Sequence, residues 1–287
     1  MYHTIKLRKK LLLLPAAILL WILLCTGASV IPKPAGEELS LGIIMYHGFA
    51  QEQALQNQYM IDPSRLEEDL QYLTANGYHT IFLSELIAHV EQHRPLPEKP
   101  VLLTFDDGYY NNYRYAFPLL KKYRCKAVIS PIAKASDDAE NEQYRSTAYS
   151  QCRWSELQEM CGSGLVELQN HTYDLHHISG GVQGAAKRPD ESLQAYEQRL
   201  RDDLGQANRR IAAVTGSPPA ALTLPFGAGG NQARELARSM GFHAVLDCEE
   251  KLNAIRSADD LFHLHRFLRP NRLSSEDFFA HTLLKQS

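Results

Sequence analysis

The sequence predicts an α/β protein whose parallel strands close into a barrel. From residue 42 onward, short apolar runs of strand length alternate with longer segments whose apolar residues recur at helical spacing. About seven or eight such strand–helix units follow one another without an internal break, which favours one barrel over two separate domains. Polar residues stand directly after several of the apolar runs, and the active sites of such barrels lie at the carboxyl ends of their strands.

Turn residues and helix caps divide the chain into these elements. Asp62 is expected to cap a helix that begins at the following proline and stops at Gly77. Ser84 is expected to cap the next helix, and Ser274 or Ser275 the last one. Besides the two helices that follow these serines, helices are expected at residues 63–76, 113–123, 154–160, 191–214 and 231–240. Strands are expected at residues 42–47, 79–83, 101–107, 126–130, 165–169, 221–224, 243–247 and 263–268.

Residues 1–36 stand apart from the predicted barrel. Four positive charges precede an apolar run at residues 11–25, which is typical of a secretory signal peptide or an N-terminal membrane anchor. Extended to Ile31, the run has about 21 residues, enough to span a bilayer. We therefore expect residues 1–36 to be a signal peptide or transmembrane anchor plus a linker. Residues 37–287 would then lie outside the cytoplasm, anchored to the membrane or secreted if the segment is cleaved.

The charge and cysteine content of the remaining chain narrows the choice of partner. Without the four positive charges of the N-terminal segment, the net charge changes from −3 to −7. No cluster of Lys and Arg remains in the sequence, which argues against nucleic acid as a partner. The four cysteines outside the apolar segment allow one or two disulfides in an oxidising compartment.

The apolar run at residues 101–107 ends in two adjacent carboxylates, Asp106 and Asp107, followed by Gly108. Two such charges repel each other and are costly to bury unless a cation or a proton compensates them. At the end of a strand both can reach one cavity, where one carboxylate can bind a metal and the other can take a proton from water. The alternative is a pair of capping residues for the next helix.

A cluster of histidines follows the expected strand at residues 165–169. His171, His176 and His177 stand within seven residues of one another. Neutral imidazole is the commonest protein ligand of zinc, and two imidazoles with one carboxylate leave a position open for water. On its own, the segment is also compatible with a solvated loop rich in histidine. In combination with Asp106 and Asp107 at another strand end, it favours a metal site.

The motif from Thr104 to Gly108, together with the pair His171 and His176, resembles the polysaccharide deacetylase family, the NodB-homology carbohydrate esterases. The resemblance covers roughly residues 42–285 and includes the opening strand that ends at His47, with the motif-bearing core beginning at about residue 99. The wide spacing of the two histidines is similar to that of the branch that deacetylates the poly-N-acetylglucosamine of biofilms. The resemblance implies a distorted (β/α)7-type barrel.

The resemblance also implies roles for the motif residues. In that family the first Asp is the general base, and the second joins two histidines on a divalent metal. Carried over, Asp106 is the base, and Asp107, His171 and His176 are the ligands. Zinc is the first choice of metal, and cobalt or nickel are the alternatives. Such a metal would polarise the acetamide carbonyl and acidify a bound water.

Two positions depart from the family pattern. Thr223 stands where the family has an Arg two residues before a Pro. The orientation of Asp106 must therefore come from elsewhere, and Arg266 is a candidate. The final motif, usually Leu-x-His, is represented loosely by residues 263–266. We choose His265 as the catalytic acid; His263, or a structural role for either histidine, is the alternative.

Other residues are candidates for contact with the sugar. Tyr109 and Tyr110 can stack on a sugar ring or offer a backbone N–H to an oxyanion, although packing in a helix explains tyrosines equally well. Pro225 and Phe226 are expected to shape the wall of the groove. His47 is expected to line the groove, or to be a packed core histidine.

These observations predict a metal-dependent hydrolase that removes N-acetyl groups from a polysaccharide or oligomer containing N-acetylglucosamine, from a cell wall or a biofilm. An esterase that removes O-acetyl groups from carbohydrate is one alternative, because the same attack by water serves both reactions. A catalytically weak carbohydrate-binding relic of the fold is the other, and the missing motif Arg motivates it. The expected partners are the polymer and, through the N-terminal segment, the membrane.

Overall fold

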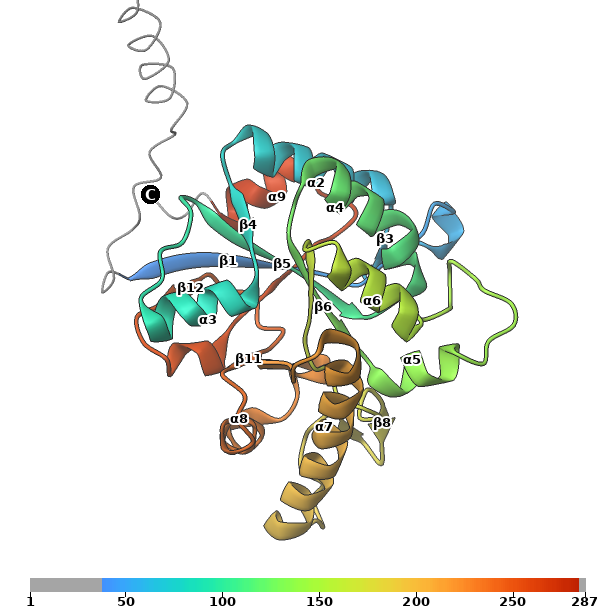
Figure 1. Cartoon of the computed structure of the whole chain (residues 1–287), viewed down its shortest axis with the longest axis vertical. Coiled ribbons are helices and arrows are strands. Elements are labelled where there is room, and N and C mark those ends of the chain that lie inside the picture. The colour runs from blue at the N-terminus through green and yellow to red at the C-terminus, as the bar shows by residue number, and fades with distance from the viewer. Residues whose placement is uncertain (1–37, 284–287) are drawn as a thin grey trace, which may run out of the picture. The chain divides into compact units, whose positions relative to one another are not determined.

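The computed structural model describes residues 38–283, where parallel strands form the centre and helices surround them (Figure 1). The central strand is β5 (Pro100–Asp107), which pairs in parallel with β1 (Leu39–Tyr46) and with β6 (Ala127–Pro131). A shorter strand, β4 (His79–Ile81), pairs in parallel with the beginning of β5. The predicted α/β class with a parallel sheet is confirmed.

Single-residue bridges extend this sheet into a distorted barrel. The further parallel strands are β7 (Val166–Leu168), β10 (Ala221–Thr223), β11 (Ala244–Leu246) and β13 (Phe267–Leu268). β6 pairs with β7, a bridge between Asn170 and Leu222 joins β7 to β10, and β10 pairs with β11. A bridge between Leu246 and Leu264 then leads toward β13, which pairs with β1. The carboxyl ends of these strands therefore meet at one end of the ring.

The helices lie outside the strands, largely where the sequence predicts them. In chain order they are α2 (Pro63–Ala75), α3 (Leu83–Gln92), α4 (Phe117–Tyr123), α5 (Ala133–Ala139), α6 (Trp154–Gly162), α7 (Leu193–Thr215), α8 (Gly230–Ser239) and α9 (Ser275–Thr282). The Asp62 side chain accepts a hydrogen bond from the Ser64 N–H at 2.8 Å, and Ser274 accepts one from the Asp277 N–H at 3.1 Å. Two of the predicted caps are thus confirmed.

The predicted cap of α3 is wrong. This helix begins at Leu83, and the carboxylate of Glu85 accepts a hydrogen bond from the Phe82 N–H at 2.8 Å. The Ser84 hydroxyl instead contacts Glu167 on β7. A serine at the second residue of a helix is free to bond a neighbouring strand, and its position in the sequence alone does not distinguish the two roles.

Several short elements were not predicted. The added strands are β12 (Asn253–Ile255), which pairs antiparallel with β1, the parallel pair β2 (Gly48–Phe49) and β3 (Met60–Ile61), and the hairpin of β8 (Ile178–Ser179) and β9 (Val182–Gln183). The helix α5 was also missed, and a π-helical turn at Asn112–Ala116 precedes α4. The last strand is shorter than predicted, because Asp260–His263 forms a 3₁₀ turn. Elements of two or three residues are too short to show a periodicity of their own.

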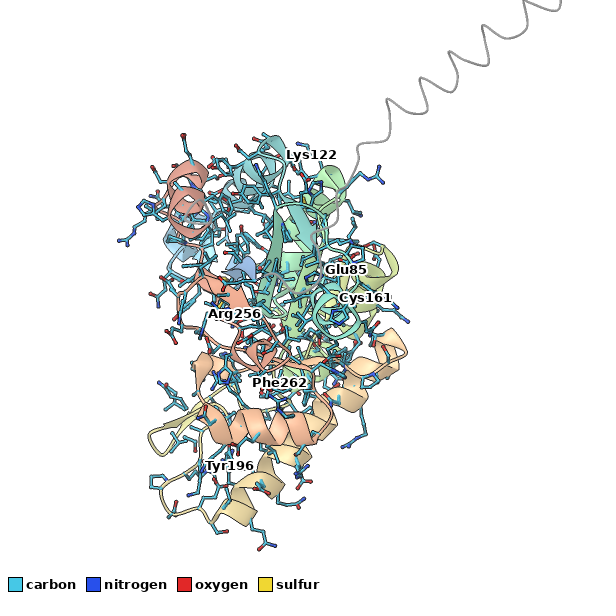
Figure 2. The ribbon with its side chains drawn as sticks, turned by 90° about the vertical axis from the view of Figure 1, so that its left-hand side faces the viewer. Glu85, Lys122, Cys161, Tyr196, Arg256 and Phe262 are labelled. Atoms are coloured by element: carbon cyan, nitrogen blue, oxygen red, sulfur yellow. The ribbon has the colours of Figure 1, made fainter. Side chains whose placement is uncertain are left out.

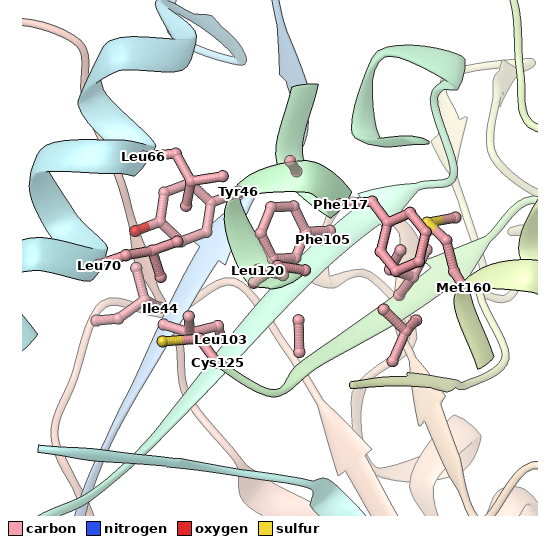
Figure 3. Close-up of a cluster of buried hydrophobic side chains, with 14 of the residues drawn as sticks. Ile44, Tyr46, Leu66, Leu70, Leu103, Phe105, Phe117, Leu120, Cys125 and Met160 are labelled. Carbon is pink, nitrogen blue, oxygen red and sulfur yellow. The ribbon is translucent and has the colours of Figure 1, made fainter. Parts of the chain in front are cut away.

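Three apolar clusters hold the barrel and its helices together. One lies between the sheet and the helices α2, α4, α6 and α9 (Figure 3), where the rings of Tyr46 and Phe105 stack at a centroid distance of 5.0 Å. A second packs α3 against the opposite side of the strands. A third joins α7 and α8 to the strands and includes Tyr196 and Phe262 (Figure 2). The strands are buried on both sides, which explains their continuous apolar runs.

The cysteines outside the N-terminal segment form no disulfide among residues 38–283. Cys125, Cys152, Cys161 and Cys248 are free thiols in this structure. Between residues 38 and 283, no helix combines the length and the apolar character needed to cross a membrane. The predicted signal peptide or anchor at residues 1–36 lies outside the described residues.

Candidate active site

The two carboxylates lie where β5 ends in a sharp turn. Asp107, the last residue of β5, has φ = 67°, and Gly108 has φ = 75°. Both values fall in the left-handed region, which is costly for most residues and favours glycine. A Cβ on Gly108 would stand 2.8 Å from the Cβ of Pro131 on the neighbouring strand β6. The turn thus directs both carboxylates into one cavity at the carboxyl ends of the strands, and the strain in it is concentrated at Asp107.

Asp106 is held by a buried arginine from the other end of the chain. Arg266 Nη1 lies 2.7 Å from Asp106 Oδ1, and Arg266 Nη2 lies 2.9 Å from Asp106 Oδ2. Both side chains are almost completely buried. Burial is the largest single effect and raises the pKa of Asp106, but the Arg266 guanidinium, together with His171 and His47, holds that pKa well below its usual range. Asp106 is therefore ionised and fixed in orientation. Arg266 holds it, as expected for a chain that has Thr223 where the family has an arginine.

Asp107 lies beside two imidazoles. Its Oδ1 is 3.4 Å from His171 Nε2 and 3.3 Å from His176 Nε2, and one ligand atom from each of the three residues lies within 4.8 Å of the others. Asp107 Oδ1 is buried and has no hydrogen-bond partner among the described residues. A buried carboxylate oxygen without a partner is costly unless a cation faces it. The donor set of two imidazoles and one carboxylate fits a divalent metal such as zinc.

The backbone determines how His171 presents its ring. Its Nδ1 lies 2.8 Å from the carbonyl oxygen of Thr223, which can only accept a hydrogen bond. Nδ1 therefore carries a proton, which leaves Nε2, the ring atom beside Asp107, as the atom that can bind a metal, as in many metal sites. Burial lowers the pKa of His171, but the carboxylates of Asp107 and Asp106 reverse that effect and leave the pKa raised. The site thus favours a positive charge between the carboxylate and the ring.

His176 completes the group from the loop that follows β7. Burial, and then the charge of His171, lower the pKa of His176, so this ring is neutral at physiological pH. It packs against Phe226 at a centroid distance of 4.5 Å, and Phe226 itself has φ = 58° and is 42% exposed. Phe226 therefore supports the second imidazole and at the same time forms part of the cavity wall.

A cavity of about 550 Å³ lies over these groups. Of the residues expected to contact a sugar, His47, Tyr109 and Phe226 line it. The sequence reasoning missed the other lining residues: Met45, Tyr59, Gln183, Cys248, Glu250 and Leu268. Met45 and Leu268 stand in strands that the sequence predicted to carry motifs, whereas the sequence offered little signal for the rest.

His47 lies beside the proposed base. Its Nε2 is 3.9 Å from Asp106 Oδ2, and its ring contacts Tyr59 at a centroid distance of 4.8 Å. Its Nδ1 is buried and has no partner among the described residues. Burial lowers the pKa of His47, although Asp106 opposes that effect. Once protonated, this imidazole is therefore a stronger acid than a free histidine.

Three of the expected site residues lie away from the cavity lining. His265 Nδ1 lies 3.0 Å from Asp247 Oδ1. The next residue, Arg266, points to Asp106. Because successive side chains of an extended segment point to opposite sides, His265 points away from Asp106. Tyr110 packs against Tyr113 and the Arg145 guanidinium, and the buried Pro225 begins the short turn that carries Phe226. The structure therefore brings together Asp106, Asp107, His171, His176 and His47, and it places His265, Tyr110 and Pro225 elsewhere.

The two amides after Gly108 are not equivalent. The Tyr110 N–H donates to the Ser150 carbonyl at 2.8 Å. The Tyr109 N–H makes no such bond to any residue between 38 and 283. Of the two candidates for an oxyanion donor, Tyr109 is thus the available one.

Comparisons with known proteins point to one family. A family model described as polysaccharide deacetylase matches residues 93–245. The poly-beta-1,6-N-acetyl-D-glucosamine N-deacetylase of Escherichia coli strain K12 is 27% identical over 259 residues, and the match covers 82% of this chain but only 37% of that protein. The protein of the same name from Staphylococcus aureus strain MSSA476 is 23% identical over 235 residues, which cover 82% of this chain and 74% of that one.

Two solved structures are similar over most of the described residues. A de-N-acetylase from Aggregatibacter actinomycetemcomitans superposes with a TM-score of 0.72 at 26% identity, covering 84% of this chain and 100% of that one. IcaB from Ammonifex degensii superposes with a TM-score of 0.68 at 27% identity, covering 88% of this chain and 99% of that one. The likeness includes the parallel barrel and extends beyond the span of the family model.

Proposed function

Because the chain belongs to the polysaccharide deacetylase family, we propose that it is a metal-dependent hydrolase that removes N-acetyl groups from a polymer of N-acetylglucosamine. The observation that carries the proposal is that the two adjacent carboxylates have different surroundings. Asp106 is ionised and held by Arg266, whereas Asp107 faces two imidazoles. The similarity to proteins named poly-beta-1,6-N-acetyl-D-glucosamine N-deacetylase supports this polymer as the substrate.

We assign the metal to Asp107, His171 and His176. A bound divalent metal would polarise the acetamide carbonyl and lower the pKa of water. Asp106, which accepts hydrogen bonds from Arg266 on both oxygens, retains lone pairs that can take the proton from the attacking water. The Tyr109 N–H is the backbone donor that we assign to the oxyanion. Zinc is the first choice of metal, with cobalt and nickel as alternatives.

We assign the proton donor for the leaving amine to His47 rather than to His265. His47 lines the cavity and lies 3.9 Å from Asp106, whereas His265 is bonded to Asp247 away from the lining. A proton taken from water by Asp106 can therefore reach the amine through His47. The burial that lowers the pKa of His47 makes its protonated form a good donor.

We also propose that the enzyme acts outside the cytoplasm. The support is the basic flank and the apolar run at residues 11–25, which serve as a signal peptide or an anchor in this proposal. Protease added to intact cells without an outer barrier should digest residues 37–287. Complete protection of this part of the chain would contradict the orientation.

Substitution of each carboxylate by asparagine tests the assignment. Asp106→Asn keeps the shape but removes the proton acceptor, so metal should stay bound while acetate release falls by about 10²–10⁴. Asp107→Asn should weaken metal binding, and excess metal should restore part of the activity. Equal loss of metal from both variants would make both carboxylates ligands and remove Asp106 as the base.

The histidines offer a matched pair for the metal. His176→Ala should lose zinc under mild chelation, whereas His177→Ala, at an exposed neighbour, should keep it. Stability should change little, because both residues lie in a loop. Full metal occupancy in His176→Ala would discard this ligand set.

The same preparations separate the alternative functions. Acetate release from N-acetylated sugars, with none from O-acetylated sugars, supports the proposal. Release from O-acetylated sugars alone would identify an esterase. Binding of the polymer without release of acetate from either substrate, by protein that carries its metal, would identify a carbohydrate-binding relic.

A further inference from the structure

A second hollow adjoins the cavity that holds the proposed active site. It has a volume of about 620 Å³ and lies between the loop after β13, the helix α9 and the loop that contains Asn57 and Gln58. Glu250 and Leu268 line both spaces. The two spaces therefore adjoin at these two residues, which places the hollow beside the active-site cavity.

The lining of the hollow has the chemistry that recognises a sugar. Phe267, Leu268 and Leu273 provide apolar surface, on which the C–H face of a pyranose ring can pack. Gln58 and Arg272 provide an amide and a guanidinium, which can bond sugar hydroxyls and acetamide oxygens. Both side chains are exposed, and neither has an ion-pair or hydrogen-bond partner within residues 38–283. These polar groups are therefore available to a ligand.

The two loops that flank the hollow are tied together. Asn271 donates from Nδ2 to Gln56 Oε1 at 2.7 Å, and its Oδ1 accepts from the Asp62 N–H at 3.2 Å. Arg269, at the base of the same loop, makes a buried bidentate ion pair with Asp69 of α2, at 2.7 and 2.9 Å. A hollow whose walls are held in this way loses little conformational entropy when it binds a ligand.

We propose that this hollow binds further N-acetylglucosamine units of the polymer whose reacting unit occupies the active-site cavity. The inference rests on the proposed function. It adds that the enzyme binds several sugar units at once, in the hollow that Glu250 and Arg272 line. The cavity with its catalytic groups serves the reacting unit, and the hollow extends the same groove. Substrates too short to reach the hollow lose those contacts.

The experiment compares β-1,6-linked oligomers of two and five N-acetylglucosamine units. The full-length, metal-loaded protein is assayed for acetate release as wild type, as the double variant Gln58→Ala/Arg272→Gln, as Arg272→Gln alone, and as Arg209→Gln. Arg209 is an exposed arginine on α7 and serves as the matched control. Thermal unfolding verifies that every variant is folded.

We expect the ratio of kcat/KM for the pentamer to kcat/KM for the dimer to exceed one in the wild type. The double variant should lower this ratio by about three- to tenfold for each hydrogen bond that is lost, and Arg272→Gln should lower it by a smaller factor. Arg209→Gln should keep the wild-type ratio. A wild-type ratio in the folded double variant, with acetate released from both oligomers, would overturn this inference and leave the proposed function standing. Absence of acetate release by the metal-loaded wild type from either oligomer would overturn the proposed function itself, and this inference with it.

Discussion

The ion pair between Arg266 and Asp106 allows a quantitative test of how the proposed base is held. Replacement of Arg266 by methionine keeps much of the side-chain volume but removes two charge-assisted hydrogen bonds of 2.7 and 2.9 Å. Asp106 is 2% exposed and Arg266 is fully buried, so water cannot take over the role of the guanidinium. The variant therefore leaves a buried carboxylate without its counter-charge.

Removal of one partner of a buried pair costs about 3–5 kcal/mol of unfolding free energy. Burial raises the pKa of Asp106, but in the folded wild type this pKa lies below the unfolded value, because Arg266 together with His171 and His47 outweighs burial. Its contribution to stability is thus present above the unfolded pKa of about 3.9 and is lost as the pH falls through the folded value. In Arg266→Met burial acts unopposed by that charge, so the carboxyl takes up a proton more easily. The stability gap between the two proteins should narrow as the pH falls.

Urea unfolding of metal-free protein, near pH 7 and again near pH 5, measures this gap without a contribution from metal binding. The double variant Asp106→Asn/Arg266→Met should recover part of the loss, because it removes the unpaired charge. Arg269→Met provides the matched control: it breaks the buried bidentate pair with Asp69, which lies outside the cavity lining. Arg269→Met should lose a similar amount of unfolding free energy. The folded, metal-loaded Arg269→Met should nevertheless release acetate, whereas Arg266→Met should not.

Two results would refute this reasoning. One is a loss of less than about 1 kcal/mol in Arg266→Met, which is the scale of an exposed ion pair. The other is a double variant that is no more stable than the single variant near pH 7. Either result would mean that Arg266 is not the group that compensates the buried charge of Asp106.

Three further outcomes are expected. His47→Gln should lower kcat by about 10²–10⁴ while metal content stays at the wild-type level, and unchanged kcat would exclude His47 as the proton donor. Gly108→Ala should destabilise the fold by more than about 1 kcal/mol in thermal unfolding, because the new Cβ would stand 2.8 Å from Pro131 Cβ at φ = 75°. Gly77 has nearly the same φ of 73°, but a Cβ added there meets nothing within 4 Å. An equal loss of stability in Gly77→Ala would therefore attribute the effect to φ and not to the contact with Pro131. Leu70→Ala, at a fully buried position of α2, should cost about 2–5 kcal/mol in urea unfolding, and a loss below that range would show that the cluster collapses around the gap.

Local sequence patterns suffice where a strand is buried along its whole length or where a side chain bonds a residue nearby in the chain. The strand that ends in Asp106 and Asp107 is buried on both sides, so its apolar run is continuous and its boundary is visible in the sequence. Asp62 and Ser274 cap helices through bonds to residues two or three positions away, and such contacts can be read from spacing. The cap at Ser84 was misjudged because its hydroxyl contacts Glu167, far along the chain.

The sequence by itself determined the class of fold and the residues that could carry the chemistry. Parallel strands bring their carboxyl ends to one edge of the sheet. The residues that follow Phe105 therefore lie close to those that follow Gln169, regardless of the conformation of the loops. Only the tertiary structure decided which partner each of these side chains has. Arg266 reaches Asp106 across 160 residues, and the Thr223 carbonyl sets the proton of His171. These pairings, and the places of His47 and His265, depend on strand register and on how the ring closes, because a shift of one residue turns a side chain to the opposite face.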